Sequence, residues 1–576
     1  MPTTQWVLPA PDPETIAELA KSLRVQPLTA RVLAARGFTD AEVASRFLKP
    51  SIAHMHSPNL LMGMPEALAR LRAAIAGQEK ILIYGDYDVD GTVSVVILKK
   101  AIELAGGQAS FHVPHRLKDG YGMRAEVVER AAAMGVRLIV SVDTGIRAGE
   151  VVRGARELGI DVIVTDHHLP EAELPPALAV VNPNRRDCSY PDKNLCGAGV
   201  AFKLVHALLA SLGWPEDKLA RMLKSFLKLV AVATVADVVP LLGENRVIVK
   251  YGLAGLHRVH NPGLRALLEV SGMLNGRAPN ARQVAFQIAP RINAAGRMDD
   301  AQNVIRMFLT EDLETARTLA KQLHSLNQER QQTEADIVRL VLEECNQVPV
   351  TEDQAALVFA GTNWHRGVVG IVASRLVERF YRPVFVLSEE DGEAQGSGRS
   401  ITPFHLLEAL ESMPDLFSRF GGHRQAAGLS MSSDMVPEFR RRLDEYARTR
   451  LTAADFHPRL AIDAVVDLKE LTTGPAVEEI LGLAPFGFGN PPPVLAMLDA
   501  EVAAEPVLLK EKHLKVHLRQ SGRNLQSTAW NFAERAGELP AGGKLDAAFS
   551  VEEDPYSESR GWGGWAAVLK DVRKSG

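Results

Sequence analysis

The sequence is poor in cysteine, and its three cysteines lie far apart. Cys188, Cys196 and Cys345 form no CxxC pair and no even disulfide set within the 576 residues. This excludes a disulfide scaffold and a cysteine-rich zinc knuckle, and it favours a reducing compartment.

Long apolar runs are also missing. The most apolar later segment, Phe226 to Leu242, is interrupted by a lysine and an aspartate, and the N-terminal residues show no basic region followed by an apolar stretch. Neither a membrane span nor a secretion signal is predicted. We therefore expect a cytoplasmic protein.

The chain has no large excess of charge of either sign. Its formal net charge of −5 gives no global sign of a polyanionic partner, although such a sum can hide local basic surfaces. A hydrophobic content of 46% and a charged content of 23% are typical of a globular protein. The length predicts about three to five domains.

Strand-like and helix-like segments alternate from about residue 80 to 182. The strand candidates are KILIYGD, ASFHVP, VRLIVSVD, DVIVTDHH and LAVVN, with helical patterns such as RAEVVERAAAMG between them, and a further helix is expected from Thr92 to Leu104. This alternation predicts a parallel α/β sheet. Residues 197–275 are mostly helical in pattern.

The later part of the chain changes character twice. Residues 311–344 keep helical spacing without glycine or proline, which predicts a long helix bridging two lobes, and a second, smaller α/β pattern follows. From about His457, short alternating segments predict an all-β domain, for which a small OB-like barrel is the leading interpretation. We expect an N-terminal extension packed on the core (1–50), a catalytic α/β domain (51–310), a bridging helix (311–347), a smaller α/β domain (348–452) and a nucleic-acid-binding β domain (453–576).

Acidic residues follow three of the predicted strands of the first lobe. Because the carboxyl ends of parallel strands meet at one edge of a sheet, these residues are expected to lie together. A further aspartate lies inside the apolar run VATVADVVPL, where an unpaired charge would be costly. The candidates are Asp86, Asp88, Asp90, Asp143, Asp166, His167, His168 and Asp237.

Each candidate also has a structural explanation: a solvated turn for the first three, a helix cap for Asp143, a loop for the histidines and an arginine pair for Asp237. Their coincidence favours a metal site, because crowded carboxylates need a cation to neutralise them. Carboxylates with one or two imidazoles and no thiolate suit Mn²⁺ or Mg²⁺ better than Zn²⁺. Two ions roughly 4 Å apart, bridged by one carboxylate, suit attack of activated water on a phosphodiester.

Longer motifs resemble those of a known superfamily. DYDVDG, DTG, DHH and ADVVPL, in that order, resemble the DHH phosphoesterases, and GGHRQAAG resembles the associated DHHA1 domain. PRINAAGRM, WHRGVVGIVASRL and PFGFGNPPP narrow the resemblance to the bacterial RecJ exonucleases over essentially the whole chain. The resemblance implies a metal-dependent exonuclease that degrades single-stranded DNA from the 5′ end to mononucleotides, in recombination and repair.

The same resemblance implies a ligand set for two ions. Asp88 and Asp143 would hold one ion, and Asp143 would bridge to a second ion held with Asp90, His167 and Asp237. Asp86 is a further candidate ligand, although other branches of the superfamily carry a histidine near its position. His168 is expected to position substrate or to support the site.

A basic segment precedes the second lobe. Residues 281–298 contain three arginines and no acid, which is compatible with an ordinary exposed basic face. Because arginine matches phosphate oxygens in two-point geometry, we favour Arg297 as a catalytic phosphate contact, with Arg291 and Asn293 supporting it.

The second lobe carries two anion-cradling patterns. Gly421-Gly422-His423 forms a turn that brings backbone amides and an imidazole toward a phosphate, unless it is only a tight turn. His423 is expected to act with Arg297 on the charge that develops at phosphorus. We expect the terminal 5′ phosphate near Ser397 and Arg399 of GSGRS, together with Arg116.

The β domain is expected to hold the DNA strand. Basic residues are dense between Lys510 and Arg523, and Trp530 and Phe532 follow as candidate stacking platforms or as barrel core. The partners implied by the resemblance are single-stranded DNA, a single-strand-binding protein and a helicase, and we expect a monomer. The alternatives are a DHH phosphoesterase for short oligonucleotides or cyclic dinucleotides, and a catalytically inactive scaffold.

Overall fold

The computed structural model describes residues 4–116, 118–120, 122–554 and 564–575. They form two compact units. The first comprises His56–Val239 and Tyr251–Pro458, and the second comprises Thr4–Met55, Pro240–Lys250 and the chain from Arg459 onward.

A five-stranded parallel sheet organises the first part of unit 1. Its strands are β2 (Lys80–Tyr84), β3 (Ala109–His112), β4 (Val136–Val142), β5 (Asp161–Thr165) and β6 (Ala179–Val181), in the order β3-β2-β4-β5-β6. The predicted parallel α/β sheet is confirmed. Strands β2, β4 and β5 are almost entirely buried, which explains their continuous apolar sequences.

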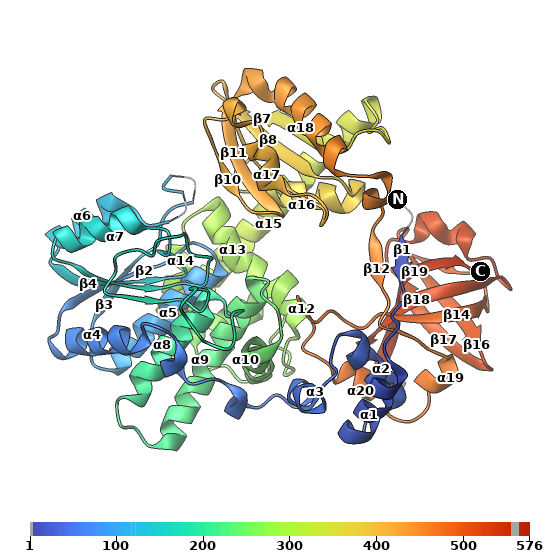
Figure 1. Cartoon of the computed structure of the whole chain (residues 1–576), viewed down its shortest axis with the longest axis horizontal. Helices are drawn as coiled ribbons and strands as arrows, with labels where there is room; N and C mark the ends of the chain where they lie inside the picture. Colours follow the sequence, from blue (N-terminus) through green and yellow to red (C-terminus); the bar gives the residue numbers. More distant parts are fainter. Residues whose placement is uncertain (1–3, 117, 121, 555–563, 576) are drawn as a thin grey trace. The chain divides into compact units, whose positions relative to one another are not determined.

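Helices cover both faces of this sheet (Figure 1). Helices α6 (Ala125–Ala133) and α7 (Gly149–Glu157) share a core with Leu82 and Tyr84 of β2. The apolar helices α5 (Val89–Leu104) and α8 (Gly197–Ala210) lie with α4 (Met64–Ala76) on the other face (Figure 1). The helices that follow, up to the bridging helix, are α9 (Glu216–Ala236), α10 (Gly243–Ala254), α11 (Pro262–Val270), α12 (Ala281–Gln283), a π-helical turn (Val284–Ile288), α13 (Ala289–Met298) and α14 (Gln302–Leu309).

The long helix α15 (Leu313–Gln347) leads into a second sheet. It begins with Asp312 as its N-cap, whose carboxylate accepts a hydrogen bond from the Thr315 amide. The second sheet has the order β10-β11-β9-β8-β7, and only β7 and β8 are parallel. Its elements are β7 (Leu357–Thr362), α16 (Val369–Phe380), β8 (Val384–Glu390), β9 (Glu393–Arg399), α17 (Leu406–Glu411), β10 (Arg419–Gly422), β11 (Ala426–Ser432) and α18 (Val436–Arg450).

The second unit contains a closed barrel. Strand β14 pairs with β18 and also with β16, and the ladders β18-β19, β19-β17 and β17-β16 complete a ring of five strands. This confirms the OB-like prediction. The C-terminal elements are β12 (Arg459–Ala461), β13 (Ala464–Val465), α19 (Leu468–Leu471), α20 (Ala476–Leu481), β14 (Leu495–Val502), β15 (Val507–Leu509), β16 (His513–Gln520), β17 (Arg523–Ala529), β18 (Lys544–Glu553) and β19 (Trp565–Lys574).

The N-terminal residues belong to this second unit. Strand β1 (Gln5–Val7) pairs in parallel with β12, and α1 (Pro13–Leu23), α2 (Pro27–Ala35) and α3 (Ala41–Leu48) share one apolar core with the barrel. The sequence predicted an extension packed on the core without saying which core. In the structure the apolar faces of these helices, with Leu28 and Leu33 fully buried, pack against residues such as Val477 and Ile480.

None of the helices in the described ranges combines the length and the apolar character that crossing a membrane requires.

Candidate metal centre

The acidic stretch after β2 folds into a helix start. The sequence placed the start of the following helix at Thr92, but α5 begins at Val89 with Asp88 as its N-cap. The Asp88 carboxylate accepts a hydrogen bond of 2.9 Å from the Gly91 amide, and this bond starts the helix three residues early. Asp90 therefore lies in the first turn of α5 and not in a loop.

Gly91 permits this tight geometry. A Cβ atom at Gly91 would lie only 2.6 Å from the Asp86 carbonyl oxygen. The glycine of the GDYDVDG motif thus allows the α5 start to lie directly against Asp86.

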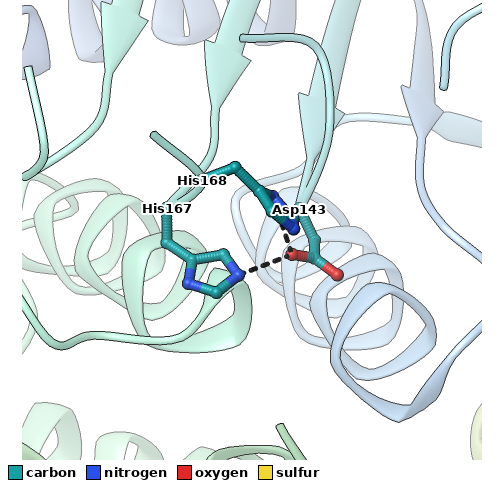
Figure 2. A group of neighbouring side chains, drawn as sticks. All are labelled: Asp143, His167 and His168. Carbon is teal, nitrogen blue, oxygen red and sulfur yellow. Dashed lines mark ion pairs between the residues drawn. The ribbon is translucent and has the colours of Figure 1, made fainter. Parts of the chain in front are cut away.

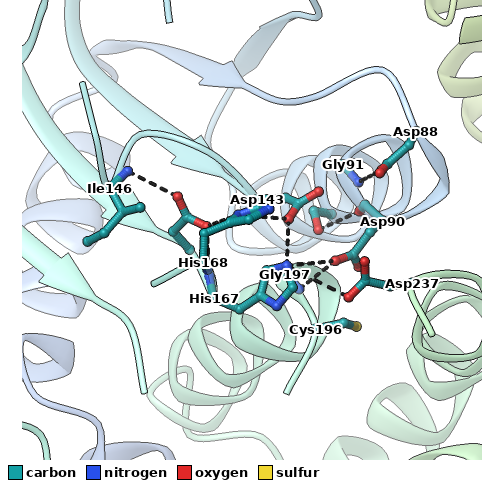
Figure 3. Close-up of polar contacts among 12 residues, drawn as sticks. Asp88, Asp90, Gly91, Asp143, Ile146, His167, His168, Cys196, Gly197 and Asp237 are labelled. Atoms are coloured by element: carbon teal, nitrogen blue, oxygen red, sulfur yellow. Dashed lines mark hydrogen bonds and ion pairs between the residues drawn. The ribbon is translucent and has the colours of Figure 1, made fainter. Parts of the chain in front are cut away.

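Asp143 follows β4 in a strained conformation. Its φ of 59° is in the left-handed region, and so is that of Val238, which directly follows Asp237. A β-branched residue rarely adopts this conformation, and such strain is typical of functional sites. These backbone conformations bring the carboxylates of Asp143, after β4, and Asp237, at the end of α9, into one cluster (Figure 3).

The start of α8 holds Asp90. The amides of Gly197 and Ala198 donate to the two Asp90 oxygens at 2.6 and 2.8 Å. Gly197 also contacts the next ligand closely, since a Cβ there would lie 2.5 Å from the Asp143 Oδ1. This contribution was not predicted, and the only local signal for it in the sequence is the small-residue run Gly197-Ala198-Gly199 at a helix start.

Asp166 supports the site instead of joining it. Its Oδ1 accepts from the amides of His167 (2.7 Å) and His168 (3.1 Å) and lies 2.7 Å from the His168 Nδ1. Its Oδ2 accepts from the Ile146 amide at 3.0 Å. Burial would raise the pKa of Asp166, but the imidazole and the amides outweigh it and lower the pKa. Both carboxylate oxygens are thus occupied by protein.

Two asparagines that the sequence analysis did not single out hold the same segment. The Asn182 amide group donates to the His168 carbonyl at 2.9 Å, and that of Asn184 donates to the His167 carbonyl at 2.6 Å. The VNPN sequence after β6 was the only signal for them.

The remaining candidates form three overlapping groups whose ligand atoms lie within 4.8 Å of one another. The His167 Nε2 lies 3.3 Å from Asp143 Oδ1, 3.7 Å from Asp237 Oδ2 and 3.9 Å from Asp90 Oδ2 (Figures 2 and 3). Asp143 is shared between two groups. The groups are Asp86, Asp88 and Asp143; Asp90, His167 and Asp237; and Asp143, His167 and His168.

Several atoms of these groups are buried without a hydrogen-bond partner among the described residues: Asp86 Oδ1, Asp143 Oδ1, Asp237 Oδ2 and His167 Nε2. Burial and then the neighbouring carboxylates raise the pKa values of Asp86 and Asp143, and they raise that of Asp237 to about 9. Unpaired oxygens and one imidazole nitrogen around shared carboxylates fit divalent cations of the Mn²⁺ or Mg²⁺ type.

The arginine-rich helix α13 lies next to this cluster. Asn293 accepts a hydrogen bond from the Val89 amide at 3.2 Å, and Arg297 donates to the Gly367 carbonyl of the second sheet domain at 3.1 Å. Burial, Arg116 and Arg399 lower the pKa of Arg297 to about 9. Asn293 and Arg297 line a cavity of about 590 Å³ together with Arg330 and other residues.

Arg291 is not brought together with Arg297. Its Nε donates to the His324 imidazole of α15 at 3.1 Å, and its Nη1 contacts the Gln287 carbonyl. The sequence had grouped the two arginines, but a spacing of six residues turns them to different sides of α13.

The second lobe contributes another cavity, of about 440 Å³. Arg116, Ser397 and Gly421 line it, and the Arg116 guanidinium lies 4.8 Å from the centre of the Tyr87 ring. Arg399 follows on β9, where burial and the charge of Arg116 lower its pKa. Gly422 has a φ of 151°, and the next residue, His423, lies outside this cavity and lines a different one with His168.

Family models match most of these parts. The DHH family N-terminal domain matches residues 80–234, the DHHA1 domain residues 353–449 and the RecJ OB domain residues 462–562. The chain is 40% identical over 544 residues to the single-stranded-DNA-specific exonuclease RecJ of Bacillus subtilis, covering 94% of this chain and 67% of that protein. It is 37% identical over 511 residues to the RecJ of Escherichia coli, with 86% and 87% covered. The chain belongs to the RecJ family.

A solved RecJ structure supports this assignment. The crystal structure of RecJ from Thermus thermophilus in complex with Mn²⁺ matches with a TM-score of 0.83 and 34% identity, covering 100% of this chain and 80% of that chain. A complex of the same RecJ with Mg²⁺ matches with a TM-score of 0.77.

Proposed function

We propose that this RecJ-family chain is a single-stranded-DNA-specific exonuclease. It hydrolyses phosphodiesters in the 5′-to-3′ direction and releases 5′-mononucleotides, with two Mn²⁺ or Mg²⁺ ions as cofactors, in DNA recombination and repair. The observation that carries this proposal is the sharing of Asp143 between two groups of ligand atoms, together with the unpartnered buried oxygens around it. Single-stranded DNA is proposed as the substrate because these relatives are named single-stranded-DNA-specific exonucleases.

The ligand roles combine the three groups. Asp88 and Asp143, with Asp86 as a candidate third ligand, would hold one ion. Asp90, His167 and Asp237 form another group, and Asp143 would join them because its Oδ1 lies 3.3 Å from the His167 Nε2. When bound, the ions supply Lewis-acid activation of water and charge neutralisation at the phosphodiester. The protein orients these ligands beforehand, through the amides on Asp90 and through Asp166 beneath the histidines.

The remaining site residues act on the phosphate. Arg297 is partly buried, keeps a positive charge near neutral pH and carries planar donors that fit phosphate oxygens. We assign Arg297 and His423 to the charge that develops at phosphorus, His168 to positioning and Asn293 to fixing the α5 start through the Val89 amide. Arg291 is assigned only to binding the DNA strand away from the reacting phosphate, because it faces His324 of α15.

The 440 Å³ cavity is proposed to determine the direction of digestion by binding the 5′ end of the strand. Arg116, Ser397 and Gly421, with Arg399 following on β9, suit a terminal 5′ phosphate. Gly421 and Gly422 end strand β10 and do not form the turn that the sequence predicted. A strand whose end is captured there presents its first phosphodiester to the metal centre.

The barrel is assigned to holding the strand. Lys515, His517 and Arg519 alternate with buried residues along β16 and so share one face of the barrel. Trp530 is 51% exposed and packs edge-on against His513, whereas Phe532 is 7% exposed and belongs to the apolar core. We therefore assign stacking on a base to Trp530 and none to Phe532.

Further parts of the proposal rest on the family or on the sequence. A single-strand-binding protein and a helicase are proposed as companions, and a monomer as the active form. A cytoplasmic location accords with three free cysteines. The division into catalytic (51–310), bridging (311–347), DHHA1 (348–452) and barrel (453–576) parts is kept, with residues 4–55 joined to the barrel.

The test is digestion of a single-stranded oligonucleotide of about 30 nucleotides, longer than one OB-fold site of about 4–16. It is labelled at the 5′ end in one reaction and at the 3′ end in another, with Mn²⁺, Mg²⁺ or chelator. We expect immediate release of labelled mononucleotide from the 5′ label, a ladder from the 3′ label and no reaction with chelator. Turnover of dinucleotides alone would instead favour the small-substrate phosphoesterase. Metal binding without any hydrolysis would favour the scaffold.

A further inference from the structure

A separate cavity of about 680 Å³ lies beside the metal centre. Its walls are the loop after β4, the loop after β5, the Gly122-Met123 segment and His423 from the second sheet domain. His168 and Asp166 line it as well, so it borders the metal centre directly. Its size is within the usual range for small-molecule sites, about 300–1,000 Å³.

One end of this cavity suits an anion. Helix α7 begins there, and its N-cap, Ala148, provides no side-chain hydrogen bond, so the first amides of the helix have no side-chain acceptor at the N-cap. The Arg147 guanidinium donates to the Leu169 carbonyl at 3.2 Å. Within the described ranges it forms no ion pair with a carboxylate.

A further group strengthens this end. His423 lines the same cavity as Arg147. Thr144 lines it as well, but its hydroxyl oxygen is enclosed by protein. An imidazole, a guanidinium and helix amides together match a phosphate group.

The acidic residues of the cavity are paired with protein groups or lie in an exposed loop. The Asp166 oxygens accept hydrogen bonds from the amides of Ile146, His167 and His168. Glu150 forms an ion pair of 2.6 Å with Arg153. Glu171 and Glu173 belong to the exposed loop after β5.

One wall of the cavity is apolar. Met123, Ile146 and Pro175 are buried, and Leu174 and Pro176 lie next to them. Such a wall provides van der Waals contact for a flat heterocycle, in the way that ligand pockets combine apolar walls with a few polar groups.

The cavity also adjoins the proposed 5′-phosphate pocket. Gly120 and Gly421 line that pocket, whereas Gly122 and His423, each two residues further along the chain, line this one. The two cavities are therefore neighbours.

We propose that this cavity binds a nucleoside 5′-monophosphate, with the phosphate at the α7 start, Arg147 and His423 and with the base against Met123 and Pro175. The natural ligand is the released product, which must leave the 5′-phosphate pocket before the shortened strand can advance. This last identification rests on the proposed exonuclease function, whereas the binding site itself does not.

The test measures binding of dAMP to the full-length chain in chelator by calorimetry. All proteins carry Arg399→Ala, which weakens the proposed 5′-phosphate pocket. Ala148→Asp is added in one protein, because aspartate is a favoured N-cap that keeps α7 folded while its carboxylate occupies the amides and repels phosphate. Arg147→Ala is added in a second, and Arg156→Ala, on an exposed turn of the same helix and outside the cavity, serves as control.

We expect dAMP to bind more tightly than deoxyadenosine or inorganic phosphate. Ala148→Asp and Arg147→Ala should each weaken dAMP binding about tenfold or more, and Arg156→Ala should not. Absence of dAMP binding, or binding that both cavity substitutions leave unchanged, would overturn the proposal. Because the assay needs no hydrolysis, an inactive enzyme would refute the proposed function without deciding the binding site.

Discussion

Gly197 offers a test of the metal centre that leaves every ligand in place. In Gly197→Ala the new Cβ would lie 2.5 Å from both the Cβ and the Oδ1 of Asp143, where ordinary contacts begin at 3.4 Å. The Asp143 carboxylate or the start of α8 must therefore move by about 1 Å. A misplacement of about 1 Å in a catalytic site can cost about 100-fold in rate, or about 2.7 kcal/mol in the activation free energy.

The assay compares kcat/KM on a 5′-phosphorylated single strand with the Mn²⁺ concentration needed for half-maximal activity. We expect kcat/KM to fall about 100-fold and the Mn²⁺ requirement to rise, with a loss of about 1–3 kcal/mol in the free energy of unfolding from overpacking. Gly199→Ala is the matched control on the same helix, because its Cβ would lie 3.3 Å from the Leu195 side chain and far from any ligand atom. Wild-type kinetics in Gly197→Ala would refute the idea that Asp143 must be held where the structure has it.

Three further predictions concern the support of the site and of the barrel. Asp166→Asn replaces a carboxylate oxygen that accepts from backbone amides with an NH₂ group that can only donate. The Mn²⁺ affinity, measured by titration, should therefore fall about 10- to 100-fold. An unchanged affinity would mean that His167 is held in place without the Asp166 carboxylate. The free energy of unfolding of the metal-free chain should fall as pH rises from about 4 to 9, because Asp237 has a pKa raised to about 9 and a carboxyl of raised pKa stabilises the fold only while protonated. Thermal melts across that range should show the loss and its reversal by Mn²⁺, whereas a flat profile would contradict the crowding of unpaired carboxylates. Arg246→Met should lower the free energy of unfolding of the second unit by about 2–4 kcal/mol, because the carbonyls of Phe47 and Ala484 both lose their hydrogen-bond donor. An unchanged melting temperature would show that the apolar core alone joins these two segments.

The sequence alone predicted the parallel sheet of the first lobe and the edge of the sheet at which the acids meet. Period and composition sufficed there, because buried parallel strands read as continuous apolar runs and acids follow three of them. The long helix was expected over 311–344 and is observed at Leu313–Gln347.

What the sequence did not predict depends on contacts between distant segments. Asp166 looked like a ligand, but its oxygens are taken by amides from its own loop and from Ile146. Arg291 looked equivalent to Arg297 until the helix geometry turned it toward α15. The N-terminal helices carried apolar faces, yet nothing local in the sequence specified that the barrel would cover them.

The most direct measurement counts ions on the metal-free chain. Titration with Mn²⁺, followed by electron paramagnetic resonance, should show two ions per chain with a spin-coupled signal, because Asp143 is proposed to ligate both ions. In Asp143→Asn the coupled signal should disappear while the protein stays folded. A single ion per wild-type chain, or a coupled pair that survives the substitution, would contradict a centre bridged by Asp143.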